Sequence, residues 1–339
     1  MTSISRWLPS PRRRVPALVL AITTVLTALS ACGSHDSDNN TAVLRVGEIG
    51  AFPQLKALLH DSGQDQGFTY TVDYSLFPRL APALIQAQEG GSVDLGWMAD
   101  TVPLFGQAAN NRIKIIAAER PLSPSSPVAL IVPTDSPIHT VADLKGKKIL
   151  YTDHTIMEYV LLKALLSAGL SWSDVDHVTL TPADALKAFD SGAVGAWSAK
   201  DPELSLETVP GKARILTTGT GITADQWYEV ASEQALANPA KKAAIKDFVE
   251  RLARAELWRN SHLDAWSSTY AGLSGLPPEV AKAVVARNLL QFVPVTPDIV
   301  AQQQKQADEL AAIGALPKLD VTGEFDSSVN PTLPAGPGR

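Results

Sequence analysis

An α/β fold of two similar lobes is the structure that the sequence predicts, and three observations support it. From Val43 onward, short apolar runs alternate with stretches of helical periodicity, which is typical of α/β proteins. The pattern restarts at Val128, so the same kind of unit occurs twice. After Val230 the chain is mainly helical, and such a stretch most economically packs back around the first lobe.

The first unit is expected to alternate strands and helices from its start. Pro53 suits the first turn of a helix, and Gly90-Gly91 is the usual left-handed stop at the end of one. The expected strands are 43–47, 69–74, 92–97 and 113–118, and the expected helices are 52–60, 82–89 and 101–110.

The second unit follows the same alternation, and the C-terminal part adds helices. Val160, Leu161 and Leu165 lie on one apolar face of a predicted helix that Gly169 closes. Residues 323–339 are rich in Ser, Pro and Gly, which predicts a disordered tail. The expected strands are 128–133, 148–151, 178–180 and 193–197, with a short helix at 141–146 and helices at 156–168, 182–190, 239–253, 256–268, 278–290 and 296–313.

Two segments of the chain resemble each other, and both end in a tryptophan. Residues 83–97 and 185–197 each read as a helix, a glycine stop and a strand that runs into Trp97 or Trp197, with Asp100 or Asp201 soon after. Each lobe would then present an aromatic residue at the carboxyl end of a strand, where open α/β sheets bind ligands. Chance similarity between common helix–Gly–strand units is the alternative.

The first residues have the pattern of a secretory signal. Arg12-Arg13-Arg14 precedes an apolar run, and small residues follow it, which is the pattern of a signal peptide over residues 1–31. Leu29-Ser30-Ala31-Cys32 resembles a bacterial lipobox, in which Cys32 is lipidated, and the polar residues 32–41 suit a flexible tether. We therefore expect a protein anchored to the cell membrane on its extracytoplasmic side. An ordinary signal peptide with an accidental cysteine is the alternative.

Composition excludes several classes of function. The 339 residues carry 29 Lys+Arg against 35 Asp+Glu, a net charge of -6, which argues against nucleic acid as a partner. A single Cys rules out an intramolecular disulfide and a multi-cysteine metal site, and the six His show no metal-ligand spacing. No Gly-x-Ser-x-Gly elbow or phosphate loop occurs, and Gly219–Ala224 reads as a turn rather than a dinucleotide fingerprint. We therefore expect no catalytic residues, no metal and no cofactor.

Four segments together carry a family resemblance. They begin with Ala99-Asp100-Thr101-Val102-Pro103 through Ala108, and continue with 135–148, 182–202 and 276–308. These segments resemble the substrate-binding proteins of ABC importers, in the nitrate/sulfonate/taurine group and its aliphatic-sulfonate branch. The resemblance implies a periplasmic binding protein-like fold of type II, with two lobes, a ligand cleft and two crossover strands. Lobe 1 would be 42–129 plus 229–322 and lobe 2 would be 130–228.

The resemblance also implies where a solute binds. Anionic ligands of this group are held by backbone N–H groups at helix N-termini, and the matching positions here lie near Phe52, at Asp100-Thr101 and at Thr155. Thr155 with Glu158 is also a capping box, which would leave that turn a purely structural role. Asp153 departs from the Gly/Ser usual at this turn, and its charge would repel a bare sulfonate, so a zwitterionic solute becomes more plausible.

Further candidates come from aromatic and basic residues. Lys200 either binds an anion or is a solvated surface lysine, and Phe77 is a candidate for the rim of the cleft. Trp97, Trp197 and Trp227 are candidates for apolar or cation–π contacts, with core packing as the alternative for each.

The predicted function is therefore that of a monomeric extracytoplasmic binding protein. It would capture a small organic sulfonate or a related zwitterionic solute by closure of the cleft and deliver it to ABC permease subunits in the membrane. The alternatives of the same fold are an enzyme like the pyrimidine synthase of thiamine biosynthesis, a pyrimidine- or amine-binding protein, and a lipoprotein sensor without transport. The enzyme carries a cysteine-rich motif, whereas this chain has only Cys32.

Overall fold

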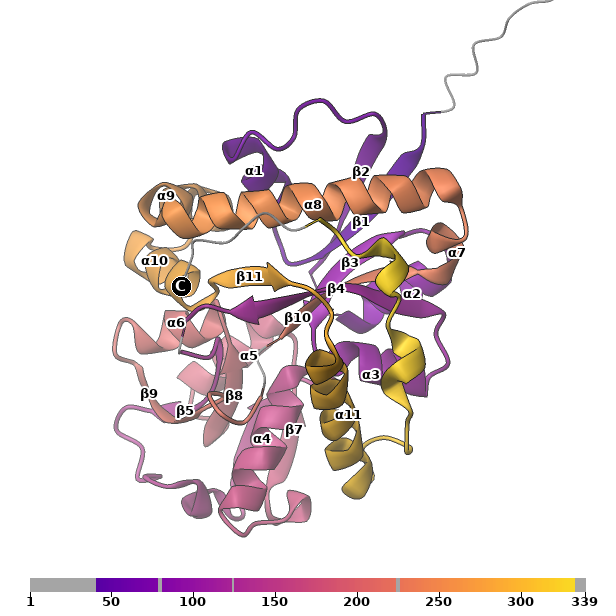
Figure 1. Cartoon of the computed structure of the whole chain (residues 1–339). Coiled ribbons are helices and arrows are strands. Elements are labelled where there is room, and N and C mark those ends of the chain that lie inside the picture. The colour runs from indigo at the N-terminus through magenta and orange to yellow at the C-terminus, as the bar shows by residue number, and fades with distance from the viewer. Residues whose placement is uncertain (1–40, 79–80, 124, 224–225, 333–339) are drawn as a thin grey trace, which may run out of the picture. The chain divides into compact units, whose positions relative to one another are not determined.

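Two β-sheets organise the chain, as Figure 1 shows. The computed structural model describes residues 41–78, 81–123, 125–223 and 226–332. The predicted signal peptide, Cys32 and residues 333–339 lie outside this part of the chain. Among the described residues, no helix combines the length and the apolar character needed to cross a membrane.

The first sheet is mixed and has six strands in the order β11-β4-β10-β3-β1-β2 among the residues described. β1 pairs in parallel with β2 and β3, whereas β10 is antiparallel to both β3 and β4. β11 adds an antiparallel edge to β4. The strands are β1 Val43–Ile49, β2 Thr71–Phe77, β3 Leu95–Ala99, β4 Ile113–Pro121, β10 Trp227–Ser232 and β11 Leu290–Val293.

The second sheet repeats this plan with five described strands in the order β7-β6-β8-β5-β9. β6 pairs in parallel with β7 and β8, and β5 is antiparallel to β8 and β9. Its strands are β5 Val128–Pro133, β6 Lys148–Tyr151, β7 Asp176–Thr179, β8 Ala196–Lys200 and β9 Ala213–Thr218.

The chain passes between the two sheets twice in the described part. It leaves the first sheet after β4 and enters the second at β5, and it returns from β9 to β10. The two sheets are therefore the cores of two lobes joined by two crossings. The sheets divide a few residues before the predicted lobe boundaries, because Val128 and Ala129 pair in the second sheet while Trp227 and Tyr228 pair in the first.

Helices cover both faces of each sheet. α8 lies across the first sheet in Figure 1, and its Phe248 and Leu252 pack with Leu44 and Leu95 from the strands beneath. α2 and α3 cover the opposite face of that sheet, while α4 covers one face of the second sheet and α5 and α6 the other. The helices are α1 Gln54–Asp61, α2 Ala81–Glu89, α3 Thr101–Ala108, α4 Ile156–Ser167, α5 Pro182–Asp190, α6 Glu203–Thr208, α7 Glu233–Leu236, α8 Pro239–Ser261, α9 Leu263–Ser274, α10 Pro278–Arg287 and α11 Pro297–Ala312, with short 3₁₀ turns at Val141–Leu144, Trp172–Asp174, Val321–Glu324 and Ser327–Val329.

Local signals explain where most helices begin and end. The side chain of Asn238 accepts hydrogen bonds from the backbone N–H groups of Ala240 and Lys241, and Pro239 occupies the first turn of α8. Thr181 caps α5 in the same way. Gly275 adopts the left-handed conformation, with φ of 70°, that ends α9.

Three sequence expectations in the C-terminal part are wrong. The helices expected at 239–253 and 256–268 are divided differently, because α8 continues to Ser261 and the break falls at His262. The helix expected at 278–290 ends at Arg287, and Leu290–Val293 instead pairs with the open edge of β4. Residues 323–332 of the expected disordered tail are packed: Phe325 bridges to Ile115 in the first sheet.

Two paired glycines let α2 approach the first sheet closely. Gly47 of β1 and Gly96 of β3 are register partners, and Leu84 of α2 lies directly over both. A Cβ atom on Gly96 would come within 2.7 Å of Leu84 Cδ2, and Leu84 is fully buried. The packing of this layer therefore depends on the absence of a side chain at these positions.

We expect Gly96→Ala to lower the free energy of unfolding by about 1–3 kcal/mol, because the added methyl group overpacks a closed layer. The matched control is Gly272→Ala in α9, where a Cβ would meet no atom within 4 Å and where helix propensity favours alanine by about 0.5–1 kcal/mol. Urea denaturation of both variants measures the difference. If Leu84→Ala costs as much in the Gly96→Ala background as in the wild type, the proposed clash is wrong.

Candidate functional site

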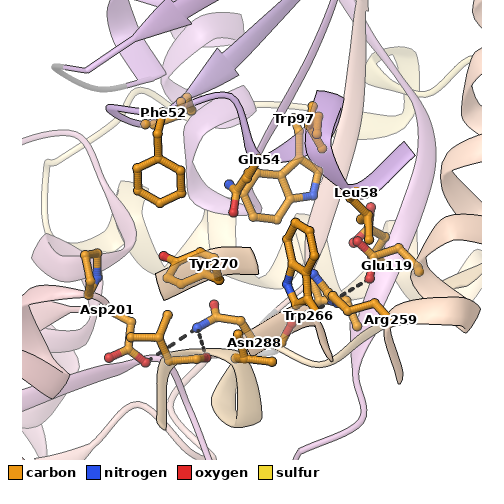
Figure 2. A pocket seen from close by; sticks show the side chains of 18 of the residues that line it. Phe52, Gln54, Leu58, Trp97, Glu119, Asp201, Arg259, Trp266, Tyr270 and Asn288 are labelled. Carbon is orange, nitrogen blue, oxygen red and sulfur yellow. Dashed lines mark hydrogen bonds and ion pairs between the residues drawn. The ribbon is translucent and has the colours of Figure 1, made fainter. Parts of the chain in front are cut away.

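A cavity of about 250 Å³ lies where the carboxyl ends of β1 and β8 meet the helices that cover the first sheet. The first lobe supplies most of its wall, and the second lobe contributes Lys200, Asp201, Pro202 and Glu203. Figure 2 shows Phe52 and Asp201 on one side of it and Trp97, Glu119 and Arg259 on the other. The cavity thus lies at the strand ends where open α/β sheets bind ligands.

Aromatic rings form much of the cavity wall. Trp97 and Trp227 stack with their ring centroids 3.9 Å apart and their planes 11° from parallel. Phe52 meets Tyr270 edge to face at 5.2 Å, and Trp266 lines the cavity beside Tyr270. These large rings give the cavity a rigid apolar wall with negative ring faces.

Lys200 is a cation of the second lobe that lies over this aromatic stack. Its Nζ atom is 4.1 Å from the ring centroid of Trp227 and 6.0 Å from that of Trp97. Burial lowers the pKa of Lys200 to about 8, although the charges of Glu203 and Asp201 oppose this shift. The alternative of a solvated surface lysine is therefore wrong, and Lys200 is a partly desolvated cation at the cavity.

Asp201, the next residue, joins the second lobe to a helix packed on the first. Its Oδ1 atom accepts hydrogen bonds from the backbone N–H and hydroxyl groups of Ser205, at 3.1 and 2.6 Å, at the start of α6. The guanidinium of Arg287 from α10 lies 2.9 Å from the same oxygen. Burial raises the pKa of Asp201 even though Arg287 and Ser205 oppose the shift.

Three buried glutamates lie on the side of the cavity nearest α8. Glu119 comes from β4, Glu229 from β10 and Glu256 from α8, and only Glu256 has an ion pair, with Arg259, among the described residues. Burial raises the pKa of Glu229 to about 8 and that of Glu256 to about 7. Burial, followed by the charges of Glu256 and Glu229, places the pKa of Glu119 well above its usual range.

The N-terminus of α1, which the sequence marks as an anion site near Phe52, is already occupied by a side chain of the protein. Oε1 of Glu48 accepts a hydrogen bond from the backbone N–H of Leu55 at 3.0 Å, and Glu48 is almost fully buried. Burial raises the pKa of Glu48 to about 8, while hydrogen bonds from Leu55 and Gln54 oppose the shift. Phe52 itself lines the cavity, but these backbone donors are taken.

The turn before α4 caps the start of that helix, which is the structural role that the sequence pattern allows. Oγ1 of Thr155 accepts from the backbone N–H of Met157 at 3.3 Å and donates to the carbonyl of Thr152 at 2.7 Å. Glu158 accepts from the backbone N–H of His154 at 2.6 Å. Asp153 is exposed, and neither Asp153 nor Thr155 is among the residues that line the cavity.

Asp100 and Thr101 belong to a different part of the molecule. Asp100 lines a second, polar cavity of about 240 Å³ beside α4 and α11, where its carbonyl accepts from Gln303 at 2.8 Å and its carboxylate from Gln306 at 3.3 Å. Thr101 opens α3 and is fully buried, and its hydroxyl has no hydrogen-bond partner among the described residues. The structure therefore does not bring Asp100 and Thr101 into the cavity with Lys200.

The tryptophans near Asp100 and Asp201 are not equivalent, although the two segments resemble each other. The spacing from the tryptophan to the aspartate differs by one residue between the two segments, Trp97 to Asp100 and Trp197 to Asp201. Trp97 lines the cavity, while Trp197 is 5% exposed and packs against Phe189 in the core of the second lobe. This placement favours the core-packing alternative for Trp197.

The remaining predicted residues border the site. Trp227 is buried under Lys200 in the aromatic stack, and Phe77, at the end of β2, packs against the apolar core next to the cavity residue Pro78. The sequence reasoning missed Glu119, Glu229, Trp266 and Tyr270. A signal for the two glutamates was present, since Glu119 directly follows the apolar run Ile115–Ala118 and Glu229 interrupts the apolar run Tyr228–Ala231.

Comparisons with known proteins give a consistent result. The family model described as "NMT1/THI5 like" matches residues 80–256. A "Putative aliphatic sulfonates-binding protein" of Escherichia coli (strain K12) is 32% identical over 275 residues, which cover 80% of this chain and 84% of that protein.

Solved structures of two binding proteins match with high coverage. The alkanesulfonate-binding protein SsuA from Xanthomonas axonopodis pv. citri, bound to MOPS, superposes with a TM-score of 0.76 and 29% identity, covering 84% of this chain and 98% of that one. The periplasmic aliphatic sulphonate binding protein SsuA from Escherichia coli gives a TM-score of 0.74 and 28% identity, covering 88% and 96%. The prediction of a two-lobed α/β fold is confirmed.

The buried glutamates predict how stability depends on pH. Because the folded state raises the pKa of Glu48, Glu229 and Glu256 to between about 7 and 8, it holds protons that the unfolded chain releases near pH 4.5. The free energy of unfolding should therefore fall as pH rises from about 5 to about 8, by roughly 1 kcal/mol or more for each group. Urea unfolding at several pH values measures this, and Glu229→Gln should flatten the curve. Constant or rising stability over this range would contradict the prediction.

Proposed function

Because this chain belongs to the NMT1/THI5-like family and to the group of the aliphatic sulfonates-binding proteins, we propose that it is the solute-binding component of an ABC importer. Its solute is a small organic sulfonate or a related zwitterion. The protein captures this solute on the extracytoplasmic side of the membrane and presents it to the permease subunits.

The two-lobed fold supports this function because the cavity takes residues from both lobes. Phe52 and Trp97 come from the first lobe and Lys200 from the second. A solute that contacts both walls favours the state in which the lobes are close together, and hinge closure is the usual motion of such proteins. The volume of about 250 Å³ is slightly below the range of about 300–1,000 Å³ for drug-sized ligands, which suits a small solute.

The observation that carries the proposal is the position of Lys200. This residue is a partly desolvated cation that projects from the second lobe over Trp227 into a cavity made mostly by the first. Its ammonium group forms no hydrogen bond or ion pair with any described residue within the usual distance limits. An anionic sulfonate supplies the missing partner, and a charge-assisted hydrogen bond is stronger than a neutral one.

The proposed location rests on the N-terminal sequence. The segment Leu29-Ser30-Ala31-Cys32 supports lipidation of Cys32, and the polar residues after it support a tether. The binding domain would then stay close to its permease without spanning the membrane.

We expect ethanesulfonate to stabilise the full chain against thermal unfolding, by about 2.7 kcal/mol at a hundredfold excess over Kd. Lys200→Met should weaken binding about tenfold or more, because it removes the cation that meets the sulfonate. The matched control is Lys187→Met, since Lys187 is an exposed lysine of α5 on the second lobe. Equal stabilisation of wild type and Lys200→Met by ethanesulfonate would contradict this role of Lys200.

We expect Cys32→Ser to release the protein from the membrane fraction of an expressing bacterium, because serine cannot carry the thioether-linked lipid. Ser34→Ala, two residues further on, is the control and should leave the protein in the membrane fraction. Fractionation followed by immunodetection measures the distribution. Retention of Cys32→Ser in the membrane fraction would show that the anchor is assigned wrongly.

A further inference from the structure

Glu119 and Glu229 are two buried carboxylates that line the cavity without a cation beside them. Each is 2% exposed, and neither forms an ion pair within 4.0 Å with a described residue. The Oε2 atom of Glu119 has no hydrogen-bond partner among the described residues. Figure 2 shows Glu119 on the cavity wall, below Trp97.

The cations near these carboxylates do not form an ion pair with either of them. Arg259 of α8, whose charge acts on Glu119 at longer range, is bonded to Glu256. Lys200 of β8 lies over the ring of Trp227, and the acids that act on it are Glu203 and Asp201. The groups that face Glu119 and Glu229 are thus Glu256 and Arg259 from α8, and the indole of Trp97 from β3 also acts on the pKa of Glu119.

The two carboxylates lie close to each other on the face of the sheet that carries the aromatic wall. Glu229 is the register partner of Trp97, and Glu119 is the register partner of Trp227. Because register partners project to the same face, the carboxylates and the stacked indoles border one region of the cavity. A desolvated carboxylate pair is costly unless a cation or protons neutralise it.

The wall around this region suits an organic cation. Trp97, Trp266 and Tyr270 present ring faces and edges to the cavity, and aromatic rings combined with carboxylates recognise ammonium groups. A metal ion fits less well, since no group of three or more His, Cys, Asp or Glu side chains in the described part of the chain is arranged to hold one.

We propose that Glu119 and Glu229 form a subsite for an ammonium group, so that the solute of this protein is an aminosulfonate or a similar zwitterion. The ammonium end lies between these carboxylates and the ring of Trp97, and the anionic end lies at Lys200. This inference rests on the proposed function, because it takes the cavity as the solute site. It goes beyond that function by assigning a positive charge to the end of the solute that lies opposite the sulfonate.

The proposal gives a distinctive pH dependence. Glu229 has a pKa of about 8, so an ammonium group must displace a proton from the pair below that pH. Lys200, with a pKa of about 8, loses its charge over the same range, which weakens the binding of any sulfonate. The ratio of two affinities, for an aminosulfonate and for the same sulfonate without its amine, cancels the contribution of Lys200.

The experiment uses three probes and the full chain in phosphate buffer. Taurine carries both groups, ethanesulfonate has the sulfonate alone, and ethylamine has the ammonium group alone. Isothermal titration calorimetry at pH 6 and pH 8 gives the three Kd values. We expect taurine to bind at least about tenfold more tightly than ethanesulfonate at pH 8, and this preference to shrink by about tenfold at pH 6.

Variants separate the two ends of the solute. Glu229→Gln and Glu119→Gln should each weaken taurine binding about tenfold or more at pH 8 and leave ethanesulfonate binding unchanged or tighter. Glu324→Gln is the matched control, because Glu324 is also a buried glutamate with a pKa raised to about 8 but lies outside the cavity. Loss of one negative charge from a desolvated site should not prevent folding, which thermal unfolding of each variant checks.

The outcomes distinguish this inference from the proposed function. Equal affinity for taurine and ethanesulfonate in every variant overturns the ammonium subsite and leaves sulfonate binding intact. A preference for taurine that is larger at pH 6 than at pH 8 also overturns the ammonium subsite, because the protonated glutamates would then be donating hydrogen bonds to the anion. Binding of ethylamine without either sulfonate supports the subsite and overturns the sulfonate half of the proposed function. Binding of none of the three overturns both.

Discussion

The removal of carboxylates from water is the constraint on which the architecture of this protein depends. A buried carboxylate needs a cation, several N–H donors or a proton. Asp94 has the first of these: Arg45 lies 2.7 Å and Lys241 2.8 Å from its oxygens, and these contacts hold its pKa below the usual range although burial raises it. Glu48 has N–H donors, because its carboxylate accepts a hydrogen bond from the backbone at the start of α1. Glu119 and Glu229 have neither an ion-pair partner nor a set of N–H donors among the described residues, and both line the cavity. The same constraint thus marks the place where we propose that the ammonium group of a solute binds.

Most of the fold could be predicted because its signals are local. The run Val128–Pro133 is continuously apolar, as a strand between two neighbours should be, and it forms β5 with the predicted bounds. The helix Pro182–Asp190 also has the predicted bounds: Thr181 caps its start, and Ser191 and Gly192 follow its end. The edge strand β11 could not be recognised in this way, since its four residues follow a helical stretch and are fixed by pairing with β4. Short segments whose conformation depends on a distant partner are where local patterns fail.

The site could be predicted only in part, because distance along the sequence hides it. Lys200 ends β8, Trp97 lies in β3 near its carboxyl end and Phe52 follows β1, so the rule that strand ends bind ligands finds them. Trp266 and Tyr270 lie in the middle of α9, where an aromatic residue reads as core, and only tertiary packing brings them to the cavity. The error at Trp197 has a different cause, since likeness in sequence does not fix which side of a strand faces the cavity, and this ring packs in the core of the second lobe. Sequence similarity between the two lobes therefore did not imply equivalent contacts.

In the function that we propose, the end of β8 would link solute capture to contact between the lobes. Lys200 faces the cavity, while the adjacent Asp201 binds Arg287 of α10, a helix packed on the first lobe. If hinge motion separated the lobes, water would reach both groups, so the ion pair would weaken and Lys200 would regain its solvation. When they approach, Lys200 loses water and its need for an anion increases, since the energy of a charge pair grows as the local dielectric falls. A solute with an anionic end therefore stabilises the arrangement in which Asp201 and Arg287 are also joined. Because adjacent residues carry both interactions, binding of such a solute at the cavity would favour contact between the two lobes.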